Sequence, residues 1–401
     1  MVLAALIGGI MLGALAGIVD PALGRSAGAI ADAVGGLWID ALRMTVIPLI
    51  VALVVTGVAG TADEQGLVPW RPLLLFVALL GMAALICVVV EPRFFIPETG
   101  GAAARAAAGL APVEAVPVPP FGDWLRGFIP ANVVSAAADG RLVSLVLFAV
   151  LFGAALTRLS ADKRGTLIQF FAALRDAMMG IVNWVLWLAP IGVFALGFAA
   201  ASANFGGLLS IGWRFVAAQG LATLLIIAAL FVVVAVVRKA RFAGFARAMV
   251  EPAVLALASR SSLACFPAMI RSAETMRLDP EPAATTLSLA VSLFKITAPV
   301  TLLAMIPAMA AFDGRSLNGG ELGLLALIGI VNSVAIAGLP AQVTLLATTL
   351  PAAEALGVPL TVLPLMVALD TLPDMLRTVA NVVGDLTAAA LLSPTLKETT
   401  R

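Results

Sequence analysis

Near its C-terminus the chain reads LMVALDTLPDMLRTVANVVGDLT, from Leu365 to Thr387. The segment is apolar enough and long enough to cross a bilayer, yet it contains three Asp, one Arg and one Asn. An α-helix turns by about 100° per residue, so these five side chains fall within a sector of roughly 80°. The five are Asp370, Asp374, Arg377, Asn381 and Asp385.

These charges cannot face lipid. A charged side chain at the centre of a bilayer costs about 2.5–3.5 kcal/mol on insertion scales. The charged face of this helix must therefore point toward protein or toward a water-filled cavity. One interpretation is an internal ion-pair network that only locks helices together. The interpretation we prefer is a polar binding site for a charged solute.

The composition predicts a multi-spanning membrane protein built as one integral unit. Hydrophobic residues make up 62% of the chain, charged residues 12%, and the mean hydropathy is +1.10. Soluble domains carry about 25% charged residues. The chain has no His, which removes His metal sites, His triads and His proton relays, and its net charge of +1 does not suggest a nucleic-acid partner. No cofactor is predicted, and Cys87 and Cys265 are expected to be free thiols.

Apolar runs of about 20 residues or more mark membrane-spanning helices. Residues 2–19 are expected to form the first such helix rather than a removed signal peptide. A Gly/Ala/Pro-rich stretch at 97–121 is expected to be an exposed loop. In the first part of the chain we expect helices near 2–19, 27–60, 70–91, 128–158 with an interruption at Asp139-Gly140, 165–200 and 209–237.

The pattern changes after residue 240. Two apolar segments, 243–272 and 322–352, are interrupted at their centres, the first by Ser259–Ser262 and the second by 337–340. Each is followed by a helix, at 282–311 with a break near 294–299 and at 361–393. Kinks in full-length helices are one explanation, but paired interruptions in corresponding places are typical of transporters with inverted repeats and a site at the bilayer midplane. The sequence thus predicts an all-α integral membrane fold with eight transmembrane helices, two re-entrant helical hairpins and inverted repeats.

Basic residues predict the orientation. Lys and Arg follow the fourth and sixth segments, precede the seventh helix and close the chain, which places all of them on one side of the membrane. By the positive-inside rule that side is the cytoplasm, and both termini lie there.

Several motifs carry a resemblance to a known family. They are the eighth-helix residues above, read as Asp370, Asp374-Met375, Arg377-Thr378, Asn381-Val382 and Gly384-Asp385, the fifth-helix run from Ala189 to Leu196, and the hairpin tips Arg260-Ser261-Ser262 and Ala337-Gly338-Leu339-Pro340. The chain resembles the dicarboxylate/amino acid:cation symporter family, the bacterial and archaeal homologues of the glutamate transporters, over nearly its whole length. The resemblance implies a homotrimer in the cell inner membrane that works by an elevator mechanism. It places the scaffold at about 1–60 and 128–208, and the transport part at about 68–92 and 209–393.

The resemblance also implies roles for individual residues. Asp374 would accept the amino group of a substrate, assisted by Thr378, and Arg377 would hold the side-chain carboxylate. Asn381 would bind the main-chain carboxylate, assisted by the backbone amide of Ser262. The hairpin tips would contribute Ser261, Gly338 and Pro340, and whether Arg260 reaches the substrate stays open. The charges agree with these roles, because an acidic amino acid presents two anions and one cation, so aspartate or glutamate is the preferred substrate.

The chain departs from the family at the cation sites. The family's seventh helix carries an Asn-Met-Asp-Gly-Thr run that supplies sodium ligands, and this chain has Phe294-Lys295-Ile296-Thr297-Ala298 instead. Of the expected side-chain sodium ligands only Asp385 remains, with Asn381 nearby, so no metal site is predicted with confidence. We hypothesise that the ammonium of Lys295, paired with Asp385, stands where a sodium ion would bind. Transport would then be proton-coupled or independent of sodium.

Three alternatives remain. The chain is a carrier of C4-dicarboxylates, an intramembrane enzyme that pairs Ser261 or Ser262 with Lys295, or a non-transporting sensor or anion-leak protein on the same fold. The enzyme is disfavoured because no recognisable nucleophile motif or water-activating metal site is present. The protein is therefore expected not to be an enzyme.

Overall fold

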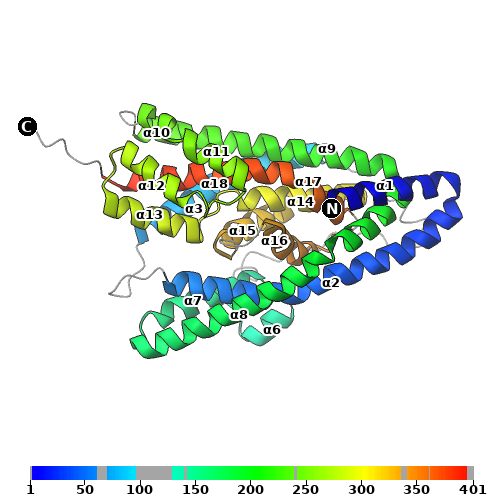
Figure 1. Cartoon of the computed structure of the whole chain (residues 1–401), viewed down its shortest axis with the longest axis horizontal. Coiled ribbons are helices and arrows are strands. Elements are labelled where there is room, and N and C mark those ends of the chain that lie inside the picture. The colour runs from blue at the N-terminus through cyan, green and yellow to red at the C-terminus, as the bar shows by residue number, and fades with distance from the viewer. Residues whose placement is uncertain are drawn as a thin grey trace, which may run out of the picture.

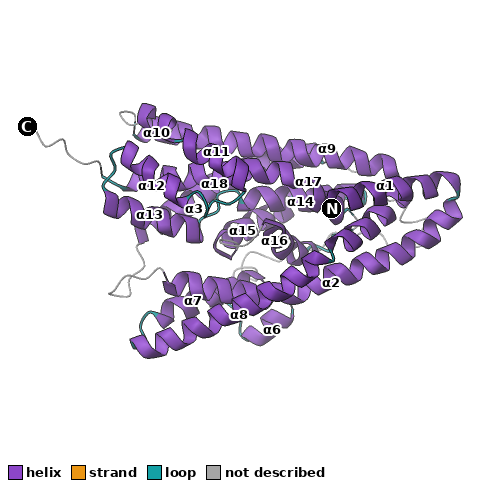
Figure 2. Ribbon diagram, in the orientation of Figure 1, coloured by secondary structure: helices purple, strands orange, loops and turns teal. Residues whose placement is uncertain are grey.

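The computed structural model describes residues 2–60, 70–95, 129–139, 142–238, 242–335, 341–360 and 362–394. Within these ranges the regular structure is helical, without a β-strand (Figure 2). Five of the described helical segments are long and apolar enough to cross a membrane, and several shorter helices are equally apolar. The chain is thus an all-helical protein with several membrane-spanning helices. The loop expected at 97–121 lies outside the described residues.

Up to α7 the chain follows the predicted segments closely. Asp139 ends α6, as expected for the interruption there, and Asn132 begins it, because its side-chain oxygen accepts from the amides of Val134 and Ser135. The helices are α1 (Val2–Val19), α2 (Pro21–Gly60), α3 (Trp70–Val90), the short 3₁₀ helix η1 (Glu91–Phe94), α6 (Val133–Ala138), α7 (Leu142–Leu156), α8 (Ala161–Trp187) and α9 (Ala189–Val237).

The predicted boundary between a helix at 165–200 and another at 209–237 is wrong. The break lies at Leu188, and α9 then runs on for 49 residues. Pro190 has no amide hydrogen to donate, so a helix ends before it and a new one begins with it in its first turn. The Gly206-Gly207 pair does not end α9, because a glycine inside a helix costs only about 1 kcal/mol relative to alanine. One helix therefore passes through residue 208, where the scaffold was expected to end.

The second half contains the interrupted segments. The expected halves of the first one, α11 (Val250–Ser259) and α12 (Phe266–Thr275), have ten residues each. Each is about 15 Å long, half the thickness of a bilayer core. The remaining helices are α10 (Phe242–Ala248), α13 (Pro280–Leu293), α14 (Ala298–Phe312), α15 (Gly319–Ala335), α16 (Ala341–Ala355), α17 (Leu363–Leu369) and α18 (Thr371–Leu392).

The segment predicted as one helix at 361–393 is divided at Asp370 into α17 and α18. Pro373 is the reason, because it has no amide hydrogen to donate to the carbonyl of Leu369. The backbone of Asp370 stays close to helical, with φ −61° and ψ −16°. The interruption therefore leaves the side chains of α18 on the face that the sequence predicts.

The helices form two groups (Figure 1). One contains α2 with α6, α7 and α8, and the other contains α3, α9 and α10–α14 with α17 and α18, while α15 and α16 lie between them. The two groups are joined where α1 and α2 pack along α9. Helix α14 is the centre of the core, since all fifteen of its residues are buried. Cys87 and Cys265 are buried and unbridged, as predicted.

Helix α1 lies along the first part of α9 at very short range. Gly9 and Gly13 face the backbone of α9, where an added Cβ atom would lie 2.3 Å from the carbonyl oxygens of Phe194 and Phe198 respectively. Small residues spaced by four let two helices approach this closely in a membrane. The N-terminal helix is therefore fixed to the same long helix that reaches the charged residues of α18.

Candidate functional site

The charged residues of α18, and Asp370 directly before it, all point into the protein. Asp370 is 4% exposed, Asp374 7%, Arg377 6% and Asp385 0%. Helix α18 packs with this side against α9, α11 and α13, while Leu372 on the other side is 65% exposed. The inward direction agrees with the cost of placing charge in lipid.

Arg377 is held by an internal carboxylate. Its Nη1 and Nη2 donate to the two carboxylate oxygens of Asp370 at 2.6 and 2.7 Å, a bidentate geometry. Nη1 also donates to the side-chain oxygen of Gln219 on α9, and Nη2 lies 3.5 Å from Asp374. A carboxylate from outside must take the place of Asp370 to form the same bidentate pair.

Asp374 is held by an internal cation. Its Oδ2 accepts from Nε of Arg260 at 2.8 Å, which links α18 to the turn between α11 and α12. Arg260 reaches it from a left-handed backbone conformation, with φ 52°, which closes the end of α11. This conformation is unfavourable for a residue other than glycine and is found mainly where surrounding contacts hold it. The structure thus brings Arg260 to Asp374, which the sequence left open.

Asn381 binds the break in the seventh segment. Its side-chain oxygen accepts from both the amide and the hydroxyl of Thr297, at 3.2 and 3.0 Å. The break is further held by Ser333 of α15, whose hydroxyl accepts from the amide of Lys295 at 2.7 Å. Irregular backbone at this depth needs such partners for its polar groups. Asn381 is therefore near the predicted cation region in this state.

Lys295 differs in part from the expectation. Its ammonium donates to the hydroxyl of Ser262 at 2.5 Å, and not to Asp385. Neither carboxylate oxygen of Asp385 accepts a hydrogen bond from a described residue, although the two side chains interact electrostatically. The ammonium is thus tied to the hairpin turn, and the expected direct pair with Asp385 is absent from this state.

The other predicted residues have smaller roles in the contacts described. The Thr378 hydroxyl donates to the carbonyl of Asp374 one turn earlier, at 2.8 Å. The Ser261 hydroxyl accepts from the amide of Ala264 and so stabilises the turn itself. Gly338 and Pro340, at the second tip, lie outside the described residues.

The sequence prediction missed two groups that contact Arg377. Asp370 was placed on the charged face but was given no role, although its position seven residues before Arg377 brings it to the same side two turns away. Gln219 was missed altogether. The available signal was an amide inside the apolar run of α9, a residue type that is seldom buried without a partner.

Metal ligands are sparse in this region. Among the residues that the structure describes, no three His, Cys, Asp or Glu side chains come together as a metal-binding group.

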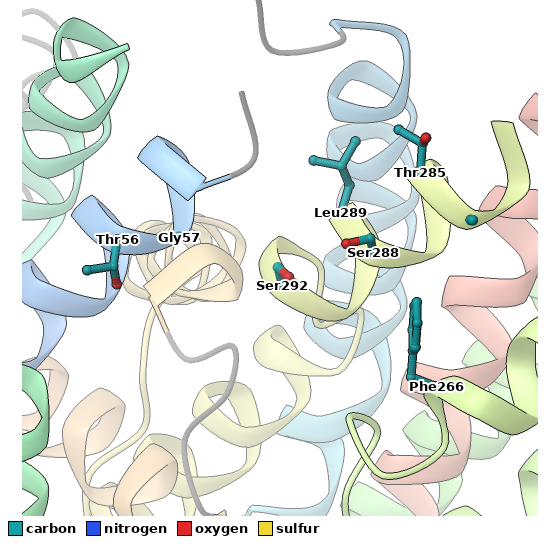
Figure 3. Close-up of a pocket in the computed structure, with 8 residues that line it drawn as sticks. Thr56, Gly57, Phe266, Thr285, Ser288, Leu289 and Ser292 are labelled. Carbon is teal, nitrogen blue, oxygen red and sulfur yellow. The ribbon is translucent and has the colours of Figure 1, made fainter. Parts of the chain in front are cut away.

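A pocket lies between α2 and α13, lined by Thr56, Gly57, Ser288 and Ser292 (Figure 3). It lies between helices of the two groups and contains none of the predicted site residues.

Comparison with known proteins covers almost the whole chain. Residues 2–394 match the sodium:dicarboxylate symporter family. The chain is 28% identical over 377 residues to the proton/glutamate-aspartate symporter of Escherichia coli strain K12, an alignment that covers 90% of this chain and 84% of the relative. It is 28% identical over 403 residues to a C4-dicarboxylate transport protein of Solibacter usitatus, covering 96% of this chain and 90% of the relative.

A vertebrate relative extends the range of named solutes. The neutral amino acid transporter B(0) of Bos taurus is 30% identical over 416 residues, covering 91% of this chain and 73% of the relative.

Three observations lead to one conclusion about the family. They are the inward charged face of α18, the interrupted helix pair that meets it and a family match over residues 2–394. The chain belongs to the sodium:dicarboxylate symporter family and is a multi-pass secondary transporter.

Proposed function

We propose that the protein carries acidic amino acids, aspartate or glutamate, across the cytoplasmic membrane. One observation supports this above all: each key side chain already holds an internal partner that has the charge of a substrate group. A carboxylate, Asp370, occupies Arg377, and a cation, Arg260, occupies Asp374. An acidic amino acid replaces both, its side-chain carboxylate at Arg377 and its ammonium at Asp374.

The remaining groups complete the binding site. Asn381, released from Thr297, holds the main-chain carboxylate together with the backbone amide of Ser262, and Thr378 assists at the ammonium. Ser261 shapes the first tip, and a role of Gly338 and Pro340 in substrate binding stays a prediction of the family resemblance. Because two of the three substrate charges exchange for like charges of the protein, Arg377 and Asp374 each keep a partner of opposite charge, and leaving either one unpaired would cost about 3–5 kcal/mol.

C4-dicarboxylates are the second candidate, and the name of the Solibacter usitatus relative favours them. A dicarboxylate satisfies Arg377 but offers no cation for Asp374, so Arg260 has to remain in place. A neutral amino acid offers a cation for Asp374 but no side-chain carboxylate for Arg377. We therefore place acidic amino acids first.

The expected assembly is a homotrimer in the cell inner membrane, with eight transmembrane helices and two re-entrant hairpins at about 243–272 and 322–352. The transport part, about 68–92 and 209–393, moves as an elevator against a scaffold of about 1–60 and 128–208, with both termini in the cytoplasm. The two groups of helices and the pocket between α2 and α13 support this division (Figures 1 and 3). Since α9 runs through residue 208, it must bend or yield near this boundary.

Sodium is not expected to drive the transport. Lys295 places a fixed ammonium near Asp385, the remnant of the cation site, and binds Ser262 at the first tip. An ammonium in this place repels a second cation and supplies the positive charge that a sodium ion otherwise brings.

Calorimetric titration of the purified protein tests the proposal. L-aspartate, L-glutamate, succinate and L-alanine are added with and without sodium. We expect the acidic amino acids to bind most tightly, independently of sodium, and Arg377→Ala to weaken them by at least a hundredfold. Arg271→Ala, on the exposed face of α12 and paired with Glu251, is the matched control and should bind as wild type does. Preferential binding of succinate would favour the second candidate, and steep sodium dependence would contradict the role given to Lys295.

A further inference from the structure

Glu91 is a buried acid that none of the roles above uses. It begins η1, which packs against α9 and α14, and it is 0% exposed. No amide, hydroxyl or cationic group among the described residues donates a hydrogen bond to its carboxylate, and its one side-chain partner is the thiol of Cys87, a weak donor. An ionised carboxylate buried with so little hydrogen bonding is strongly unfavourable, whereas the neutral acid is much less so. The geometry therefore favours a proton on Glu91 in this state.

The charged neighbours of Glu91 lead to the substrate site. Glu91 interacts electrostatically with Arg377 and with the thiol of Cys87, which lies one turn earlier on α3. Helix α14 contributes no ionisable side chain, α9 contributes Arg214, and Arg93 of η1 is exposed. The cation whose electrostatic field reaches Glu91 is Arg377 on α18.

The charges around Arg377 balance without Glu91. Arg377 is matched by Asp370, and Asp374 is matched by Arg260. Ionised Glu91 would therefore add an excess negative charge to a site that has to accept an anion. Protonated Glu91 removes that repulsion.

We propose that Glu91 is the proton-binding group that couples proton uptake to the binding of an anionic solute at Arg377. This inference rests on the proposed function and adds its coupling ion. Coupling free energy is reciprocal, so the anion favours the proton on Glu91 as much as the proton favours the anion. Solute and proton then cross together, and once the solute has departed, the Glu91 carboxyl group releases its proton to water on the side of higher pH.

Proton counting during binding tests this directly. L-aspartate is titrated in buffers of equal pH but different heats of ionisation, at several pH values. We expect wild-type protein to take up close to one proton per aspartate at a pH where Glu91 of the solute-free protein is ionised. In that range its affinity for aspartate should fall about tenfold for each unit by which the pH rises. Glu91→Gln, which imitates the neutral acid, should take up no proton and bind with the same affinity at each pH.

Glu251→Gln is the matched control, because this acid on α11 is exposed and pairs with Arg271. It should keep the wild-type proton count. If Glu91→Gln yields no folded protein, Glu91→Leu replaces it, since it also lacks a titratable group and suits an apolar environment. Proton uptake that persists in the Glu91 variant, or that is missing in wild-type protein, would overturn the proposal. Failure of wild-type protein to bind any acidic solute would instead overturn the proposed function.

Discussion

Lys295 is the residue at which this chain differs most clearly from the sequence motifs of the family it resembles. It is 9% exposed and contacts Ser262, while Asp385 lies near enough to interact with it electrostatically. The carboxylate of Asp385 has no hydrogen bond from the residues described. The ammonium is thus the cation whose charge would offset a negative charge on Asp385. Its removal should be felt in folding as well as in transport.

Lys295→Met should lower the stability of the protein and abolish uptake of labelled aspartate into proteoliposomes. Leaving one buried charge of a pair without the other costs about 3–5 kcal/mol, which the midpoint of thermal unfolding reports. The second substitution Asp385→Asn, made in the same protein, should restore much of the stability, because both charges are then gone. Unchanged uptake by the single variant would show that Lys295 has no role in the cycle.

At the scale of elements, α18 and the break between α13 and α14 form one unit. Gly384 on α18 faces this break, where an added Cβ atom would lie 3.1 Å from Phe294 and 3.2 Å from Ile296. The Phe294 ring in turn stacks on Phe76 of α3, with centroids 4.6 Å apart. The glycine therefore lets α18 approach the irregular backbone that carries Lys295.

Gly384→Ala should separate these elements slightly and destabilise the protein by about 1–3 kcal/mol, as overpacking of a core does. Gly81→Ala on α3 is the control, because nothing lies within 4 Å of its added Cβ atom, and alanine is the better helix former. Thermal unfolding in the same detergent measures both. If the two variants lost equal stability, packing of α18 against the break would not be the cause.

At the scale of the whole molecule, α2 and α13 belong to different groups of helices and contact each other beside the pocket in Figure 3. Gly57 faces Leu293 there, with 3.6 Å between an added Cβ atom and a methyl carbon of Leu293. The proposed elevator movement would change this contact in every cycle. A bond across it should stop the movement without touching the substrate residues.

Gly57→Cys combined with Leu293→Cys, in a protein whose two native cysteines are replaced, should be bridged by mercuric ion. We expect bridging to abolish aspartate uptake into proteoliposomes, a thiol reductant to restore it, and aspartate binding to persist throughout. Each single-cysteine protein treated with the same reagent is the control. Undiminished uptake by the bridged protein would contradict relative movement of these two elements.

Helical breaks could be predicted from the sequence where the backbone chemistry of the local residues causes them. The interruption of the seventh segment near Lys295 agrees with the prediction, and so does the interruption at Ser259–Ser262. The division of the preceding half into α10 and α11 at Met249 was not predicted. The break at Leu188 and the interruption at Asp370 were misplaced or missed, although Pro190 and Pro373 were visible. A long apolar run hides such boundaries, because its hydropathy is the same on both sides of the proline.

By itself, the sequence determined the all-helical membrane class and the inward direction of the charged face, because lipid excludes charge and the helical period places Asp374 and Arg377 on one side. Only the tertiary structure decided the partner of each charge. Arg377 meets Gln219, Asp374 meets Arg260 and Lys295 meets Ser262. The physical reason is that helical periodicity gives the direction of a side chain around its own axis, whereas a partner across the interior depends on how distant helices pack.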